Sequence, residues 1–148
     1  MRAAILRDDS GTLNIEDVTI DKPDRNEVLI KTVASGLCHS DLHFIDGSWS
    51  FLAMYPMLLG HEAAGVVQAV GEDVVGIQTG DHVITCLSMF CGYCERCLTG
   101  HSYLCSERQQ VQGRQPGNQP RITDNDGAEV NQFTGIGSFG EEMLVHQN

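Results

Sequence analysis

Four of the six cysteines in this chain are crowded between positions 91 and 105, and this cluster restricts the possible folds more than any other feature. Cys91, Cys94 and Cys97 are separated by two residues each, and Cys105 follows after a gap of seven. Zinc prefers four soft ligands in a tetrahedron, and a tight turn through Gly92 can bring the first three thiolates to one side. The sequence therefore predicts a closed, structural zinc site that helps to fold the lobe at about 88–106.

Two other interpretations of the cysteine cluster stay open. The first three spacings match a bacterial iron–sulfur run, but the expected fourth cysteine, followed by proline, is missing. Disulfides or free thiols are the second alternative. Because the N-terminus lacks the apolar run of a secretion signal, we expect a reducing compartment, where crowded cysteines are more often metal ligands. Cys86 lies in an expected strand, and we predict that it is a buried core thiol.

The length and the net charge of the chain restrict its possible functions. A chain of 148 residues with 41% hydrophobic content is the size of one domain that can bury its core without disulfides. Nucleic acids and anionic membranes attract Lys and Arg, so a net charge of −11 with nine such residues argues against both as partners. No stretch approaches the roughly 18 apolar residues of a membrane span. We expect a soluble, cytoplasmic protein.

Short strands punctuated by glycine turns dominate the secondary-structure pattern. Strands are expected at 3–6, 13–18, 27–34, 61–70, 81–85 and 142–145. A short helix should begin at a Ser40 cap and end near Gly47, and a hairpin should form around 125–127. The stretch 109–119, rich in Gln, Gly and Pro, is the expected mobile loop. This pattern predicts a mostly β fold, a partly open barrel with one or two helices.

A second group of potential ligands lies outside the cysteine-rich lobe. Cys38 stands at an expected strand-to-helix junction, and His61 and Glu62 follow about twenty residues later. Each residue alone is a weak signal. A catalytic zinc keeps one position open and commonly has cysteine and histidine ligands, and Cys38 and His61 fit that chemistry.

The order of these motifs resembles one known family. The resemblance covers nearly the whole chain and rests on four motifs, namely Gly36-Leu37-Cys38-His39-Ser40-Asp41, Gly60-His61-Glu62-Ala63-Ala64-Gly65-Val66-Val67, Gly80-Asp81-His82-Val83 and the four-cysteine lobe. Their order and spacing are similar to those of zinc-containing medium-chain alcohol dehydrogenases. The resemblance implies that residues 1–148 form the GroES-like catalytic domain of such an enzyme.

The resemblance also implies a catalytic metal site. Cys38 and His61 look like ligands of the catalytic zinc, and Glu62 looks like the adjacent carboxylate that can substitute as a ligand. Asp41 resembles the acid that holds the imidazole of His61, and an oriented ring nitrogen fixes the tautomer and tunes the metal.

Further roles follow from the same resemblance. Ser40 and His43 resemble the hydroxyl and imidazole that relay the proton of the alcohol to solvent, and His39 resembles the residue that meets the cofactor pyrophosphate. Three residues can line a substrate cleft, although an ordinary core role is an equally good interpretation of each: Trp49, Leu87 and Phe133.

Two parts of the family's enzyme are not expected in this chain. The family takes its third catalytic cysteine from beyond the position of Asn148, and it binds NAD on a separate doubly wound domain. The stretch 135–140 does spell the dinucleotide fingerprint, but Glu141 and Glu142 follow where a pyrophosphate needs positive potential. We interpret it as a glycine-rich turn before a strand, and the chain as a fragment. Glu62, a water molecule or a neighbouring molecule would then complete the metal at Cys38 and His61.

The predicted function is therefore that of a catalytic-domain fragment of a zinc-dependent alcohol dehydrogenase. Such an enzyme oxidises alcohols reversibly to aldehydes or ketones with NAD or NADP, and its full-length form is expected to be a homo-oligomer. The isolated fragment is expected to be inactive. The alternatives are a zinc-stabilised binding module without catalysis and a related polyol or formaldehyde-adduct dehydrogenase.

Overall fold

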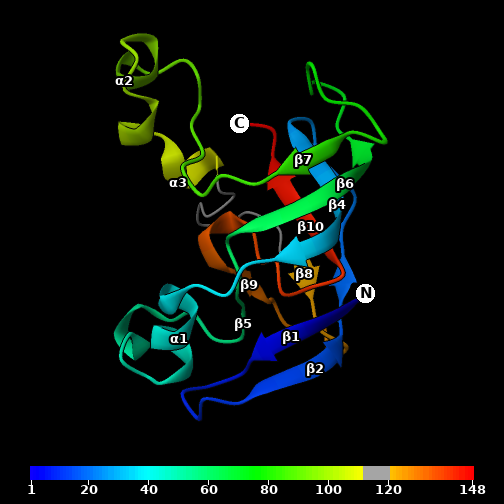
Figure 1. Ribbon diagram of the computed structural model, residues 1–148, viewed down its shortest axis with the longest axis vertical. Coiled ribbons are helices and arrows are strands. Elements are labelled where there is room, and N and C mark those ends of the chain that lie inside the picture. Colours follow the sequence, from blue (N-terminus) through cyan, green and yellow to red (C-terminus); the bar gives the residue numbers. More distant parts are fainter. Residues whose placement is uncertain (112–120) are drawn as a thin grey trace.

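The computed structural model describes residues 1–111 and 121–148 (Figure 1). Its strands are β1 (Arg2–Leu6), β2 (Leu13–Asp17), β3 (Thr19–Ile20), β4 (Glu27–Ser35), β5 (Met57–Leu58), β6 (Ala63–Val70), β7 (His82–Ile84), β8 (Ile122–Thr123), β9 (Asn131–Gln132) and β10 (Glu142–His146). Its helices are α1 (His39–Ile45), α2 (Glu95–Leu98) and α3 (Arg108–Val111), with single 3₁₀ turns η1 (Ser50–Leu52), η2 (Ser102–Leu104) and η3 (Phe133–Gly135). The predicted loop at 109–119 lies outside the described residues, except that 109–111 belong to α3.

The strands form two four-stranded sheets and one short pair. One sheet has the order β2-β1-β5-β9, and the other has the order β10-β4-β6-β7, while β3 pairs with β8. The neighbours are antiparallel except for β5 and β9, which are parallel. The described strands do not close into one barrel. The mostly β, partly open architecture predicted from the sequence is thus confirmed.

Strand β4 shows why these sequences form sheets. Val28 and Ile30 are buried and Lys31 is exposed, which is the alternation of a strand with one face on the core. Val28 and Ile30 pack with Val67 of β6 and Met143 of β10 in one hydrophobic cluster. This cluster fixes the centre of the second sheet.

Strand β5, in the sheet with the order β2-β1-β5-β9, contributes one residue to each of two further hydrophobic clusters. Leu58 packs with Ile5 of β1 in one cluster, and Met57 packs with Leu6 of β1 and Phe44 of α1 in the next. The chain leaves this core through Leu59, which is fully buried, and runs directly into Gly60 and His61. The core therefore anchors the segment that carries the candidate ligands His61 and Glu62.

Three expectations about individual segments are corrected by the structure. The helix begins at His39 with Cys38 at the cap position, and not at a Ser40 cap, because the Asp41 side chain accepts the Cys38 N–H. The strand expected at 61–70 begins only at Ala63. Cys86 is exposed and lies beyond the end of β7, which is a three-residue strand at the edge of its sheet.

The predicted hairpin is confirmed. The N–H of Gly127 donates to the carbonyl of Asp124 at 3.0 Å, and the N–H of Val130 donates to the carbonyl of Ile122 at 2.9 Å. β8 also pairs with β3, a contact between distant segments that local sequence patterns do not indicate. Among the described residues, no helix is long and apolar enough to cross a bilayer.

We expect Leu58→Ala to lower the free energy of unfolding by about 2–5 kcal/mol, because it leaves a cavity at a fully buried position. Leu37→Ala is the matched control, because Leu37 is 87% exposed and its truncation should change stability by less than about 0.5 kcal/mol. Urea unfolding of both variants measures the difference. Equal losses would contradict the placement of β5 in the core.

Candidate metal centres

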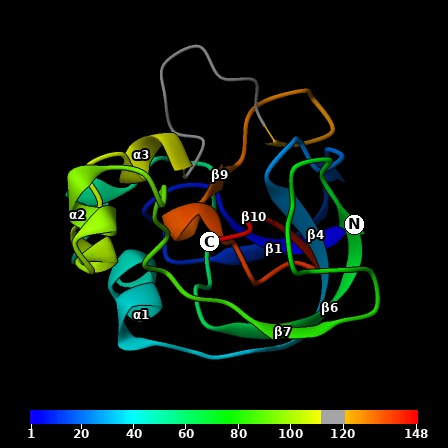
Figure 2. The same ribbon diagram turned by 90° about the horizontal axis from the view of Figure 1, so that it is seen from above.

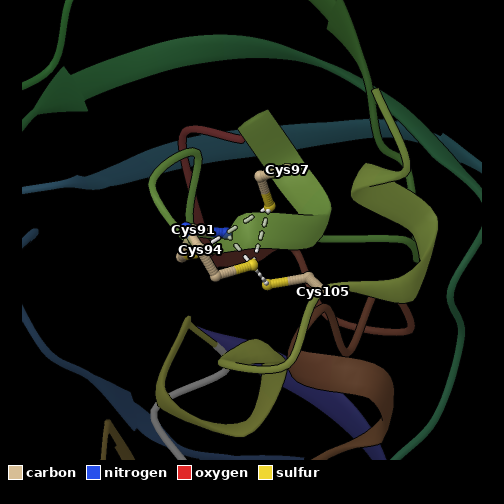
Figure 3. Close-up of side chains that lie close together, drawn as sticks. All are labelled: Cys91, Cys94, Cys97 and Cys105. Atoms are coloured by element: carbon tan, nitrogen blue, oxygen red, sulfur yellow. Dashed lines mark hydrogen bonds between the residues drawn. The ribbon is translucent and has the colours of Figure 1, made fainter. Parts of the chain in front are cut away.

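The four-cysteine lobe projects from the sheets beside α2 (Figure 1). Cys91 precedes a turn at Gly92, whose φ of +81° is in the left-handed region that glycine adopts without strain. Cys94 is the cap residue of α2, Cys97 lies within that helix, and Cys105 ends η2. Two tight turns and two short helical segments thus direct all four side chains to one point (Figure 3).

The sulfur positions fit a tetrahedral metal. All four Sγ atoms lie within 4.8 Å of one another. Cys97 Sγ is 3.4 Å from Cys94 Sγ and 3.9 Å from Cys91 Sγ, and Cys94 Sγ is 4.0 Å from Cys105 Sγ. Sulfurs bound at about 2.3 Å around a tetrahedral zinc would be about 3.8 Å apart. The structure therefore brings together the four cysteines predicted from the spacing, in a geometry that suits zinc.

Backbone donors favour negative charge on these sulfurs. The N–H of Cys94 points to Cys91 Sγ at 3.3 Å, and the N–H of Cys91 points to Cys105 Sγ at 3.3 Å. Hydrogen bonding from the backbone of Cys97 and from Ser106 lowers the pKa of Cys94 to about 5, whereas burial raises the pKa of Cys97 to about 12. The backbone donors thus favour the thiolate form at Cys94. A divalent ion would stabilise the remaining thiolates.

A second cluster combines three different ligand types. Cys38, at the cap of α1, lies close to His61 and Glu62, which follow β5, and one ligand atom from each lies within 4.8 Å of the others. His61 Nε2 is 4.0 Å from Glu62 Oε1. The His61 side chain is 5% exposed and the Glu62 side chain is 55% exposed. A metal here would be held from the protein side by sulfur and nitrogen, and would stay accessible on the side of Glu62.

Asp41 connects the two segments that carry this cluster. Its carboxylate accepts the N–H of Cys38 at 3.1 Å and the N–H of Gly60 at 3.0 Å, and Oδ1 lies 3.4 Å from His61 Nδ1. Asp41 is 3% exposed, so its charge is stabilised by these donors and not by water. A proton on Nδ1, facing Asp41, leaves the Nε2 lone pair for a metal.

The other predicted site residues lie along α1 and beside it. Ser40 Oγ is 3.7 Å from Cys38 Sγ. The His43 ring lies between those of His39 and Trp49, with centroids 4.7 Å from each. Phe133 packs edge-on against His61 at 5.2 Å. Phe133 therefore borders the cluster, whereas Trp49 packs against His43 and Phe44 of α1. Leu87 is exposed, and its carbonyl accepts a hydrogen bond from Arg108.

The sequence assigns no role to Gly60 or Ser138, which both lie directly behind His61. Gly60 has φ +87°, and a Cβ there would come within 2.3 Å of Ser138 Oγ. The sequence feature that could have indicated this close contact is the glycine immediately before the candidate ligand His61. The glycine-rich stretch 135–140 forms a turn before β10, as the sequence analysis expected.

The family of the chain follows from comparison with known proteins. Residues 24–148 match the alcohol dehydrogenase GroES-like domain. The chain belongs to this family. A solved structure described as an alcohol dehydrogenase zinc-binding domain protein from Burkholderia ambifaria has a TM-score of 0.87 and 35% identity, covering 99% of this chain and 40% of that one. Benzyl alcohol dehydrogenase from Acinetobacter calcoaceticus has a TM-score of 0.77 and 33% identity, covering 99% and 39%.

Relatives with curated functions carry related names. The S-(hydroxymethyl)glutathione dehydrogenase of Saccharomyces cerevisiae is 35% identical over 97% of this chain and 37% of its own length. An alcohol dehydrogenase of Moraxella sp. is 37% identical over 100% of this chain and 38% of its own length. The chain thus spans about two fifths of the length of these relatives. The expected resemblance to alcohol dehydrogenases is confirmed.

We expect Asp41→Asn to destabilise this domain by about 1–3 kcal/mol, because an amide nitrogen would face a buried N–H donor and leave it unsatisfied. Asp9→Asn, at an exposed position, is the control and should leave the free energy of unfolding unchanged. Urea unfolding at neutral pH measures both. A stable Asp41→Asn variant would show that the carboxylate does not hold α1 against Gly60.

Proposed function

We propose that this domain binds and orients the alcohol in a zinc-dependent alcohol dehydrogenase that uses NAD or NADP. The observation that carries the proposal is the pair of unlike metal centres, one enclosed by four sulfurs and one made of Cys38, His61 and Glu62 with an accessible side. A purely structural module has no need of the second. The names of the similar proteins support the same reaction class.

The two centres would have different tasks. Cys91, Cys94, Cys97 and Cys105 would hold a structural zinc, because four thiolates leave no position for a substrate. Cys38 and His61 would hold a catalytic zinc, with Glu62 able to act as a further ligand. When bound there, zinc supplies a Lewis acid that lowers the proton affinity of the alcohol oxygen.

The residues around the second centre would orient the ligands and move the proton. Asp41 would keep the His61 ring in the tautomer with a free Nε2. Ser40, beside Cys38, would accept the proton of the alcohol, and His43, three residues later on the same helix, would pass it to solvent. His43 Nδ1 is buried without a hydrogen-bond partner among the described residues and lies 4.0 Å from Asp46 Oδ2, whereas the side chain as a whole is 32% exposed. The exposed part of the ring would provide the contact with solvent.

The cofactor and substrate would enter from the α1 side. His39 is exposed at the start of α1, where its imidazole N–H could donate to a pyrophosphate oxygen. Trp49 and Phe133 would provide the apolar wall for the carbon chain of the alcohol. Similar proteins are named for benzyl alcohol and for S-(hydroxymethyl)glutathione, so an aromatic alcohol and a formaldehyde adduct are the substrates to test first. Polyols and a homo-oligomeric assembly stay predictions.

We expect the chain to bind two divalent metal ions with different spectra, and Cys97→Ser to remove the one bound by four thiolates. Cobalt titration followed by thiolate-to-metal absorption measures both ions. Cys86→Ser is the matched control, because this exposed cysteine lies outside both clusters and its loss should change neither ion. Loss of metal in Cys86→Ser, or retention of both ions in Cys97→Ser, would contradict the assignment.

We expect benzyl alcohol to shift the visible absorption of cobalt at the second centre and to leave that of the four-thiolate centre unchanged. The reason is that only the second centre leaves a side open to an oxygen ligand. S-(hydroxymethyl)glutathione serves as the second probe, and Cys38→Ser should abolish both shifts. Alcohols that leave both spectra unchanged would favour a zinc-stabilised binding module instead. With these 148 residues alone, no NAD reduction is expected.

A further inference from the structure

A pair of hydrogen-bonded serine hydroxyls, one buried and one half-buried, lies next to the segment that carries the second candidate metal centre. Ser138 Oγ and Ser35 Oγ are 2.7 Å apart. Ser138 is 2% exposed and comes from the glycine-rich turn before β10, whereas Ser35 is the last residue of β4. The two residues are 103 positions apart in the chain. The contact therefore exists only because the fold brings β4 and the turn together.

The hydroxyl pair leads to the main chain of Glu62. Ser35 Oγ lies 3.4 Å from the carbonyl oxygen of Glu62 and 3.3 Å from that of Gly36. If Ser138 donates to Ser35, the Ser35 hydroxyl is left to donate to one of these carbonyls. The Glu62 carbonyl also accepts the N–H of Gly36 at 2.7 Å. The main chain of Glu62 is thus hydrogen-bonded to Gly36, directly after β4, and is within reach of Ser35, which contacts Ser138.

The same turn also holds the residue before His61. The N–H of Ser138 donates to the carbonyl of Gly60 at 3.1 Å, and the N–H of Phe139 donates to that of Leu59 at 3.0 Å. Gly60 has room for this contact only because it lacks a Cβ, which would come within 2.3 Å of Ser138 Oγ. Phe133 of η3, which precedes this turn, packs against the His61 ring.

We propose that Ser138 is a positioning residue for the metal centre, acting through Ser35 and Gly60 on the backbone of His61 and Glu62. Ser138 contacts the segment on both sides of His61. Its N–H donates to the carbonyl of Gly60, and its hydroxyl is hydrogen-bonded to Ser35, which in turn contacts the carbonyl of Glu62. Small errors in ligand position weaken a metal site, because the donor atoms must converge on one point. This inference rests on the proposed function, since it requires a metal at Cys38, His61 and Glu62.

The test is cobalt binding to the 148-residue chain and to its variants. Ser138→Ala should weaken binding at the second centre about tenfold, the lower end of the effect of residues that orient metal ligands. Binding at the four-thiolate centre should not change. Ser35→Ala should weaken the second centre similarly, and the double variant should be little worse than either single one, because both remove the same link.

Thr32→Val provides the matched control. Thr32 lies on the same strand as Ser35, and its buried Oγ1 has no hydrogen-bond partner among the described residues. Loss of this hydroxyl should leave both metal centres unchanged. Thermal unfolding of every variant, without metal, separates a general loss of stability from a change at one centre.

Three outcomes would overturn the inference. Unchanged second-centre affinity in Ser138→Ala would show that the hydroxyl does not position the ligands. Equal weakening of both centres would show that Ser138 acts only on overall stability. A wild-type chain that binds a single cobalt ion, at the four thiolates, would remove the proposed catalytic centre together with this inference, whereas the first two outcomes leave that centre intact.

Discussion

The buried carboxylate of Asp41 is the interaction on which the candidate catalytic centre depends. It accepts the N–H of Cys38 from one segment and the N–H of Gly60 from another, and it faces His61 Nδ1. Burying a carboxylate is unfavourable unless its oxygens accept hydrogen bonds, so the charge is stable only when both segments are in place. The same contacts that stabilise Asp41 thus bring a thiol and an imidazole together.

Hydrophobic packing also fixes the two segments that Asp41 connects. Leu58 and Leu59 are fully buried, and Phe44 of α1 packs in the same cluster as Leu59. Gly60 and His61 follow these buried residues directly, so the position of their backbone is restricted by the core. In both views of the molecule α1 and α2 lie on the same side of the strands (Figures 1 and 2). The two candidate metal centres therefore lie on one side of the domain and are formed by different local structures.

Sequence reasoning succeeded where the relevant contacts are local. The hairpin around 125–127 and the turn before β10 follow from glycine and asparagine signals within a few residues, and both are present. It failed at Cys86, because the exposure of a residue near an edge strand depends on what packs beside that strand. The Ser40 cap was wrong for a related reason, since the cap of α1 is set by the reciprocal contact between Cys38 and Asp41.

The sequence by itself determined the four-thiolate lobe, because closely spaced cysteines on tight turns can meet in only a few ways. It also determined the family of the domain, because the order and spacing of the motifs can be read without a structure. The tertiary structure decided the second centre. Cys38, His61 and Glu62 come together through the pairing of β4 with β6 and through Asp41, and Ser138 contacts Ser35, which is 103 positions earlier in the chain. Contacts over such separations depend on the packing of whole sheets, which no local pattern of residues encodes.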